Sequence, residues 1–110
     1  MSELGYLEHQ PTRAELDQLR GVTAVMFGTN WCGYCRAAHQ HFAEAFERFA
    51  DVNVVRVEDG KGRPLGRSFA VKLWPTMVVL RDGVEVARVV RPHSTDEICE
   101  ALQVGARGGT

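Results

Sequence analysis

Two cysteines separated by two residues are the part of the sequence whose types and spacing are best suited to chemistry. The segment reads Trp31-Cys32-Gly33-Tyr34-Cys35, and the pattern after it places Cys32 at a helix start. A thiolate is the nucleophile of disulfide chemistry, and the unpaired N–H groups and partial positive charge of a helix N-terminus stabilise this anion. Cys35, one turn further on, can attack a mixed disulfide formed by Cys32. The spacing therefore predicts thiol–disulfide exchange.

A metal half-site is the alternative chemistry for the same pair. Cys32 and Cys35 with two of His39, His41 and His93 would complete a tetrahedral Zn²⁺ site. A second Cys-x-x-Cys is missing from the sequence, and His39 and His41 point roughly 160° apart on a 3.6-residue helix. We therefore expect no metal and no other cofactor, so that a redox-active Cys32–Cys35 disulfide carries the chemistry alone.

Composition excludes several other classes of function. The chain has 110 residues, which suits one domain, and 13 Lys+Arg against 14 Asp+Glu give a net charge of −1. No positive field is available to neutralise phosphates, so neither nucleic acid nor an anionic membrane is an expected partner. Three cysteines do not suit a paired disulfide framework, and Cys99, beside Ile98 on a terminal helix, is predicted to pack as a small hydrophobe.

The first twenty residues bear on location. They carry charges throughout and lack the basic start, apolar run and cleavage site of a secretory signal. No stretch approaches the roughly 20 apolar residues that a membrane span requires. We expect a cytoplasmic protein that is a monomer.

The elements that must position the cysteines follow from apolar periodicity and capping residues. Strands are predicted at 4–7, 22–28, 52–57, 76–80 and 84–90, and helices at 12–20, 32–50, 64–70 and 94–104. The order predicts an α/β fold, a three-layer α/β/α sandwich with a central mixed sheet. We expect one domain over residues 1–104 and a flexible tail over 105–110.

Three features together resemble the thioredoxin family over nearly the whole chain. They are the Trp-Cys-Gly-Tyr-Cys motif after an apolar strand, the Trp74-Pro75-Thr76 step before the next one, and the Asp82-Gly83 hairpin. The resemblance implies the thioredoxin fold, with Pro75 in the cis form next to Cys32. It also implies that the backbone at Trp74 and Thr76 is free to pair with an extended substrate. The implied substrate-binding residues are Trp31, Gly33, Tyr34, Trp74, Pro75 and Thr76.

Two departures from the family pattern bear on mechanism and specificity. Met26 stands where thioredoxins usually place a buried aspartate, and Val54 stands where its lysine partner lies. Glu58, Asp59 or a water is then expected to help Cys35 lose its proton, and the sequence does not choose among them. The second departure is Arg91-Pro92-His93, where the family usually carries small residues beside the docking groove, so we expect a narrower choice of substrate.

The resemblance and the motif together predict a thiol–disulfide oxidoreductase that reduces protein disulfides. Cys32 attacks the substrate, Cys35 resolves the mixed disulfide, and a thioredoxin-reductase-type flavoprotein or another dithiol protein restores the pair. A disulfide oxidase or isomerase with the same residues is one alternative, to be distinguished by the reduction potential. A thioredoxin-like binding module with little turnover is the other.

Overall fold

β1 (Val22–Gly28) is the central strand, and every residue of it after Val22 is buried. The computed structural model describes residues 5–7 and 10–107. In it β1 pairs in parallel with β2 (Asn53–Glu58) and antiparallel with β3 (Thr76–Arg81), which pairs antiparallel with β4 (Val84–Val90). The strand order is β2-β1-β3-β4. The predicted mixed sheet is confirmed.

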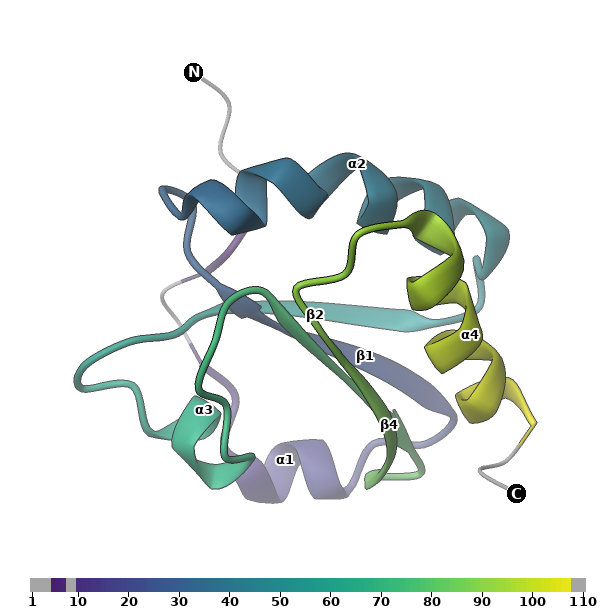
Figure 1. Cartoon of the computed structure of the whole chain (residues 1–110). Coiled ribbons are helices and arrows are strands. Elements are labelled where there is room, and N and C mark those ends of the chain that lie inside the picture. Colours follow the sequence, from purple (N-terminus) through teal and green to yellow (C-terminus); the bar gives the residue numbers. More distant parts are fainter. Residues whose placement is uncertain (1–4, 8–9, 108–110) are drawn as a thin grey trace.

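Helices cover both faces of this sheet because successive side chains of a strand point to opposite sides. Ala24 and Met26 pack toward α2 (Gly33–Arg48) and α4 (Thr95–Ala106). Val25 and Phe27 pack toward α1 (Arg13–Asp17) and α3 (Pro64–Ser68). Figure 1 shows the two pairs of helices on either side of the strands, as a three-layer sandwich requires.

The β3–β4 hairpin closes the sheet as the Asp-Gly pair predicts. Asp82 and Gly83 have φ values of 51° and 84°, and a two-residue turn with both φ values positive matches the right-handed twist of the flanking strands. The Asp82 carboxylate also accepts a hydrogen bond of 2.7 Å from the backbone N–H of Gly21. This bond ties the hairpin to the start of β1.

Helix ends differ from the sequence-based expectation at several places. α1 ends at Asp17 and α3 at Ser68, and Leu7 forms a single bridge with Val57 in place of a regular strand. Residue 4 of that predicted strand lies outside the described part of the chain.

α4 runs through Gly105, which was predicted to begin a flexible tail. A Cβ at Gly105 would lie 2.7 Å from a methyl of Val79 and 3.0 Å from one of Val22. Glycine therefore allows the last turn to approach the sheet closely, and Arg81 donates a hydrogen bond of 3.1 Å to its carbonyl. Tertiary packing overrides the helix-ending tendency of glycine here, and the tail residues 108–110 lie outside the described range.

None of the helices described is long and apolar enough to cross a membrane.

Substituting Gly105→Ala tests this packing. Alanine is favoured over glycine inside a helix by about 1 kcal/mol. We expect the opposite sign here, a loss of about 1–2 kcal/mol of unfolding free energy, because an added methyl overpacks the contact with Val79. Urea unfolding measures it, with the exposed Gln103→Ala as a control for propensity alone. A stabilised Gly105→Ala variant would contradict the close approach.

Candidate active site

The two cysteines of the motif lie at the start of α2 at different depths. Cys32 is the N-cap residue, and its sulfur accepts a hydrogen bond of 3.2 Å from the backbone N–H of Cys35. Both are free thiols, with 8% of Cys32 and 2% of Cys35 exposed. Cys32 is thus the more accessible sulfur, and a donor already points at it, which suits a nucleophile whose reactive form is an anion.

Cys35 lies in surroundings that oppose its ionisation. Burial, and then the hydrogen bond with Cys32, raise the pKa of Cys35 to about 12. The backbone N–H of Thr29 and the hydroxyl of Tyr6 lower the pKa of Cys35, because each is a donor that favours a negative charge on the sulfur. Cys35 is therefore a neutral thiol at neutral pH, and these two contacts are the groups that favour its thiolate.

Tyr6 is a site residue that the sequence did not reveal. It is 5% exposed, and its hydroxyl lies beside the Cys35 sulfur next to Gly28, the last residue of β1. Burial and the neighbouring Cys35 raise the pKa of Tyr6 above its ordinary value. A lone tyrosine in a short apolar segment carries no motif, so only the tertiary contact identifies it.

The segment that carries Tyr6 is fixed by its backbone. The Asn30 side chain accepts a hydrogen bond of 3.0 Å from Tyr6 N–H and donates one of 3.1 Å to Tyr6 C=O. Both backbone groups of the neighbouring Leu7 are bonded to β2. Its N–H donates to Arg56 C=O at 3.3 Å, and its C=O accepts from Glu58 N–H at 2.8 Å. These four bonds direct the tyrosine ring toward the cysteines.

Both acids proposed from the sequence have partners other than Cys35. Glu58 forms an ion pair of 3.3 Å with Arg63, and Asp59 accepts a hydrogen bond of 2.8 Å from the Trp74 indole N–H. Neither carboxylate is among the groups that shift the pKa of Cys35. Met26 is buried and apolar on the cysteine side of the sheet, so the usual acidic position is filled by a side chain that cannot accept a proton.

The Trp74–Pro75 loop lies against the motif. The Trp74–Pro75 peptide bond is cis, as the resemblance implied. The rings of Trp31 and Trp74 meet edge to face with centroids 6.0 Å apart, and 73% of Trp31 and 59% of Tyr34 are exposed. The cysteines are therefore bordered by an aromatic surface that solvent reaches.

The region just described falls within one family model. The family model called Thioredoxin matches residues 6–104. The chain belongs to the thioredoxin family. Its fold is the thioredoxin fold, and the structure of thioredoxin 2 from Pseudomonas aeruginosa PAO1 in its reduced form is similar to it, with 55% identity and a TM-score of 0.84. The match covers 94% of this chain and 96% of that one.

Curated thioredoxins match at lower identity. Thioredoxin H2-1 of Oryza sativa subsp. japonica is 33% identical over 69 residues, which are 63% of this chain and 50% of the rice protein. Thioredoxin Asp f 28 of Aspergillus fumigatus is 28% identical over 83 residues, 76% of this chain and 77% of the fungal protein. The chain thus spans about half the length of the rice relative.

Arg91 alters the docking loop expected for the family. Its guanidinium carbon lies 3.8 Å from the centroid of the Tyr34 ring, and its Nε donates a hydrogen bond of 2.8 Å to Trp74 C=O. Its backbone N–H donates to Pro75 C=O at 2.9 Å. Thr76 is 1% exposed and lies in β3 between Phe27 and Val90. The expectation of free backbone is therefore corrected at Thr76 and at the Trp74 carbonyl.

His41 and Cys99 make their contacts outside the cysteine pair. The ring of His41 contacts the Thr95 hydroxyl at 3.2 Å, and within residues 5–7 and 10–107 no group of three metal-ligating side chains is brought together. Cys99 is partly buried and packs against the core between the sheet, α2 and α4, as predicted.

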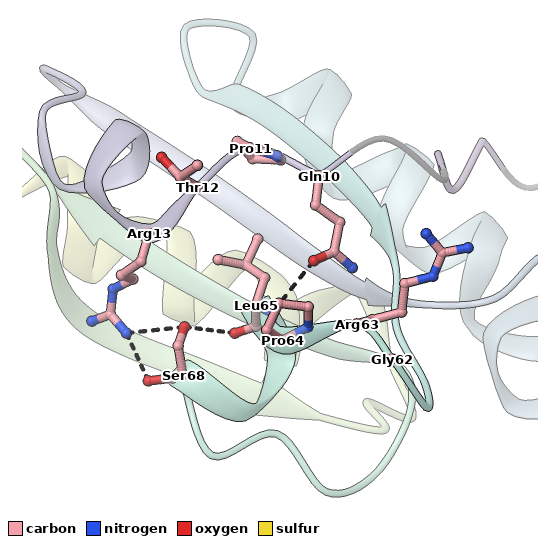
Figure 2. Close-up of a pocket in the computed structure, with 9 residues that line it drawn as sticks. All are labelled: Gln10, Pro11, Thr12, Arg13, Gly62, Arg63, Pro64, Leu65 and Ser68. Carbon is pink, nitrogen blue, oxygen red and sulfur yellow. Dashed lines mark hydrogen bonds between the residues drawn. The ribbon is translucent and has the colours of Figure 1, made fainter.

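A cavity of about 480 Å³ lies between the start of α1 and α3. Figure 2 shows its lining side chains, with Arg13 directed at Ser68 and Gln10 at Leu65. Gln10 donates to Glu58 C=O at 2.8 Å, and Arg13 donates to Ser68 C=O at 2.7 Å. These hydrogen bonds hold the start of α1 and the residues before it to α3 and to the end of β2, and no cysteine borders the cavity.

The raised pKa of Cys35 predicts how stability depends on pH. The unfolded chain loses this proton near pH 9.0, whereas the folded protein keeps it up to about pH 12. The unfolded state then binds fewer protons, so the unfolding free energy of the reduced protein should fall as pH rises, by at most about 1.4 kcal/mol per pH unit.

Urea unfolding under reductant between pH 9 and 10 measures this slope. Cys35→Ala should make it shallower, because the variant has no buried thiol to keep protonated. Tyr6 contributes chiefly above its ordinary pKa of 10.0, so the window isolates the cysteine. Equal slopes in the parent and Cys35→Ala would contradict the burial of an un-ionised thiol.

Proposed function

We propose that this protein is a dithiol reductase of protein disulfides. Membership of the thioredoxin family with a Cys-x-x-Cys pair supports a thiol–disulfide oxidoreductase. The observation that carries the proposal is the arrangement of the pair itself. The accessible Cys32 sulfur receives the Cys35 N–H at 3.2 Å, and the second thiol is held one helical turn away beneath it.

In the first step the Cys32 thiolate attacks one sulfur of a substrate disulfide. The Cys32–substrate S–S bond forms, the substrate S–S bond breaks, and the departing substrate thiolate takes up a proton. The Cys35 N–H and the N-terminus of α2 stabilise the attacking anion, so this step requires no acidic side chain of the protein.

In the second step the Cys35 thiolate attacks the Cys32 sulfur. The Cys32–Cys35 bond forms, and the second substrate thiolate leaves and gains the proton that Cys35 has lost, directly or through water. The protein gives up two electrons and the substrate gains two. A two-electron donor of the thioredoxin-reductase type, or another dithiol protein, would then restore the pair.

The substrate surface is the aromatic border of the pair. Trp31 and Tyr34 offer exposed apolar area, the Trp74–Pro75 loop lies beside them, and Gly33 leaves open space, with no atom within 4 Å of a Cβ built there. An extended segment of a partner protein fits such a surface because its border is formed by large exposed side chains. Thr76 supports the loop from inside.

The setting proposed for this reaction is a reducing compartment, the cytoplasm. There the pair would be kept as a dithiol by its donor, and the protein would act as a monomer on protein substrates. A net charge of −1 provides no field for binding nucleic acid or anionic lipid.

Trapping with Cys35→Ser tests the mechanism. This variant should form a stable mixed disulfide with insulin through Cys32, because the resolving thiol is gone. Cys32→Ser should lose insulin reduction by at least about a hundredfold, and Cys99→Ser should keep the parent rate, since its sulfur lies beside Arg48 at the opposite end of α2 from the pair. Mass spectrometry identifies the adduct, and insulin turbidity under dithiothreitol gives the rate.

The opposite pattern would overturn the proposal. Undiminished insulin reduction by Cys32→Ser, or the absence of any adduct with Cys35→Ser, would remove Cys32 from the chemistry.

The equilibrium reduction potential of the pair, measured in a glutathione buffer, tells whether the protein reduces or oxidises its substrates. A value near that of thioredoxin, about −270 mV, supports reduction, whereas one near −120 mV would indicate an oxidase.

A further inference from the structure

We infer that the Tyr6 hydroxyl is a catalytic group of the resolving step, where it donates a hydrogen bond to the Cys35 thiolate as this attacks the mixed disulfide. The inference rests on the proposed exchange reaction. It assigns to Tyr6 the stabilising part that the sequence left open among Glu58, Asp59 and water.

The position of Gly28 brings the two groups together. A Cβ built on Gly28 would lie 2.7 Å from the Cys35 sulfur and 2.9 Å from the Tyr6 hydroxyl oxygen. The missing side chain of Gly28 is therefore the space that the phenol and the sulfur share. Both groups are buried, at 5% and 2% exposure, so little water competes for the sulfur.

The chemistry of the phenol restricts it to donating. Burial and the nearby cysteines raise the pKa of Tyr6, whereas the charge of Arg56 lowers it, and the result stays above the ordinary value. The hydroxyl thus keeps its proton at neutral pH and does not take the one that Cys35 loses. That proton passes to the departing substrate thiolate, and the contribution of Tyr6 is to favour the charged form of Cys35.

The apolar replacement at Met26 explains why a neutral donor suits this site. A carboxylate buried beside a forming thiolate would need a paired cation, and Val54 offers none. A phenol stabilises the anion without adding a second charge. Asn30 fixes this phenol by hydrogen-bonding both backbone groups of Tyr6, so the donor is in place before the mixed disulfide forms.

Tyr6→Phe in a Cys99→Ser background tests the inference by stopped-flow reaction with 5,5′-dithiobis(2-nitrobenzoate). Attack by Cys32 releases one equivalent of nitrothiobenzoate, and resolution by Cys35 releases the second. We expect an unchanged first phase and a second phase about threefold slower at pH 7. Loss of one charge-assisted hydrogen bond lowers the thiolate population about tenfold, and the greater nucleophilicity of a more basic thiolate recovers part of that.

The pH profile separates this role from a structural one. In Tyr6→Phe the second phase should reach a given fraction of its maximal rate about one pH unit higher, with the first-phase profile unmoved. Thr23→Val is the control, because it removes another buried hydroxyl that lies on the opposite face of the sheet, at the far end of β1 from the cysteines. Its two phases should equal those of the parent.

A second measurement keeps the test decisive if Tyr6→Phe folds poorly. In a Tyr34→Phe background, 3-fluorotyrosine placed at position 6 supplies a more acidic hydroxyl in a ring of nearly the same shape. The second phase should then accelerate at a lower pH than in the Tyr34→Phe protein that carries ordinary tyrosine at position 6.

An unmoved second phase in both experiments, or equal slowing of both phases, would overturn the role of Tyr6. If the parent shows both phases but does not reduce insulin, the proposed function fails and the role of Tyr6 in disulfide closure stands. If the parent reduces insulin and Tyr6→Phe matches it in both phases, the role of Tyr6 alone fails.

Discussion

Cys35 must be buried for its sulfur to lie beneath Cys32, and burial in turn opposes the ionisation that its attack requires. The first turn of α2 imposes both conditions, because the N-cap position brings Cys32 to the edge of the molecule and directs Cys35 toward the sheet. The reactivity of the pair therefore depends on how the surroundings of one buried sulfur treat a negative charge. A site that solvated this sulfur with water would lose the closeness of the two thiols.

Neutral hydrogen-bond donors around Cys35 partly offset the cost of ionising a buried sulfur. The Thr29 N–H and the Tyr6 hydroxyl favour the thiolate, while the layer around them, including Met26, is apolar. Such an arrangement leaves no charge stranded when the pair is oxidised, which a buried carboxylate would do without a partner. The last residue of β1 allows this arrangement, because Gly28 has no side chain and so leaves space for the Cys35 sulfur and the Tyr6 ring to lie next to each other.

The outer surface of the site is organised by Arg91. Its side chain joins the Tyr34 ring on α2 to the Trp74 carbonyl before the cis-proline, so the two segments that border the cysteines are held by one guanidinium. An arginine suits this place because it stacks on an aromatic face and donates hydrogen bonds at the same time. A partner that docks here meets an exposed aromatic surface whose loop carbonyl is already occupied, which narrows the set of backbone groups left for recognition.

The sequence by itself determined the features that depend on residues within a few positions of one another. They are the bounds of β1 and β4, the Asp82-Gly83 turn, the helix cap at Ser94 and the spacing of the two cysteines. Only the tertiary structure decided the burial of Gly105 and the arrival of Tyr6 beside Cys35. A glycine near a helix end and a tyrosine in a short apolar segment have several local meanings. Which one applies is fixed by contacts with β1, β3 and α2, elements distant along the chain, and no periodicity or motif records such contacts.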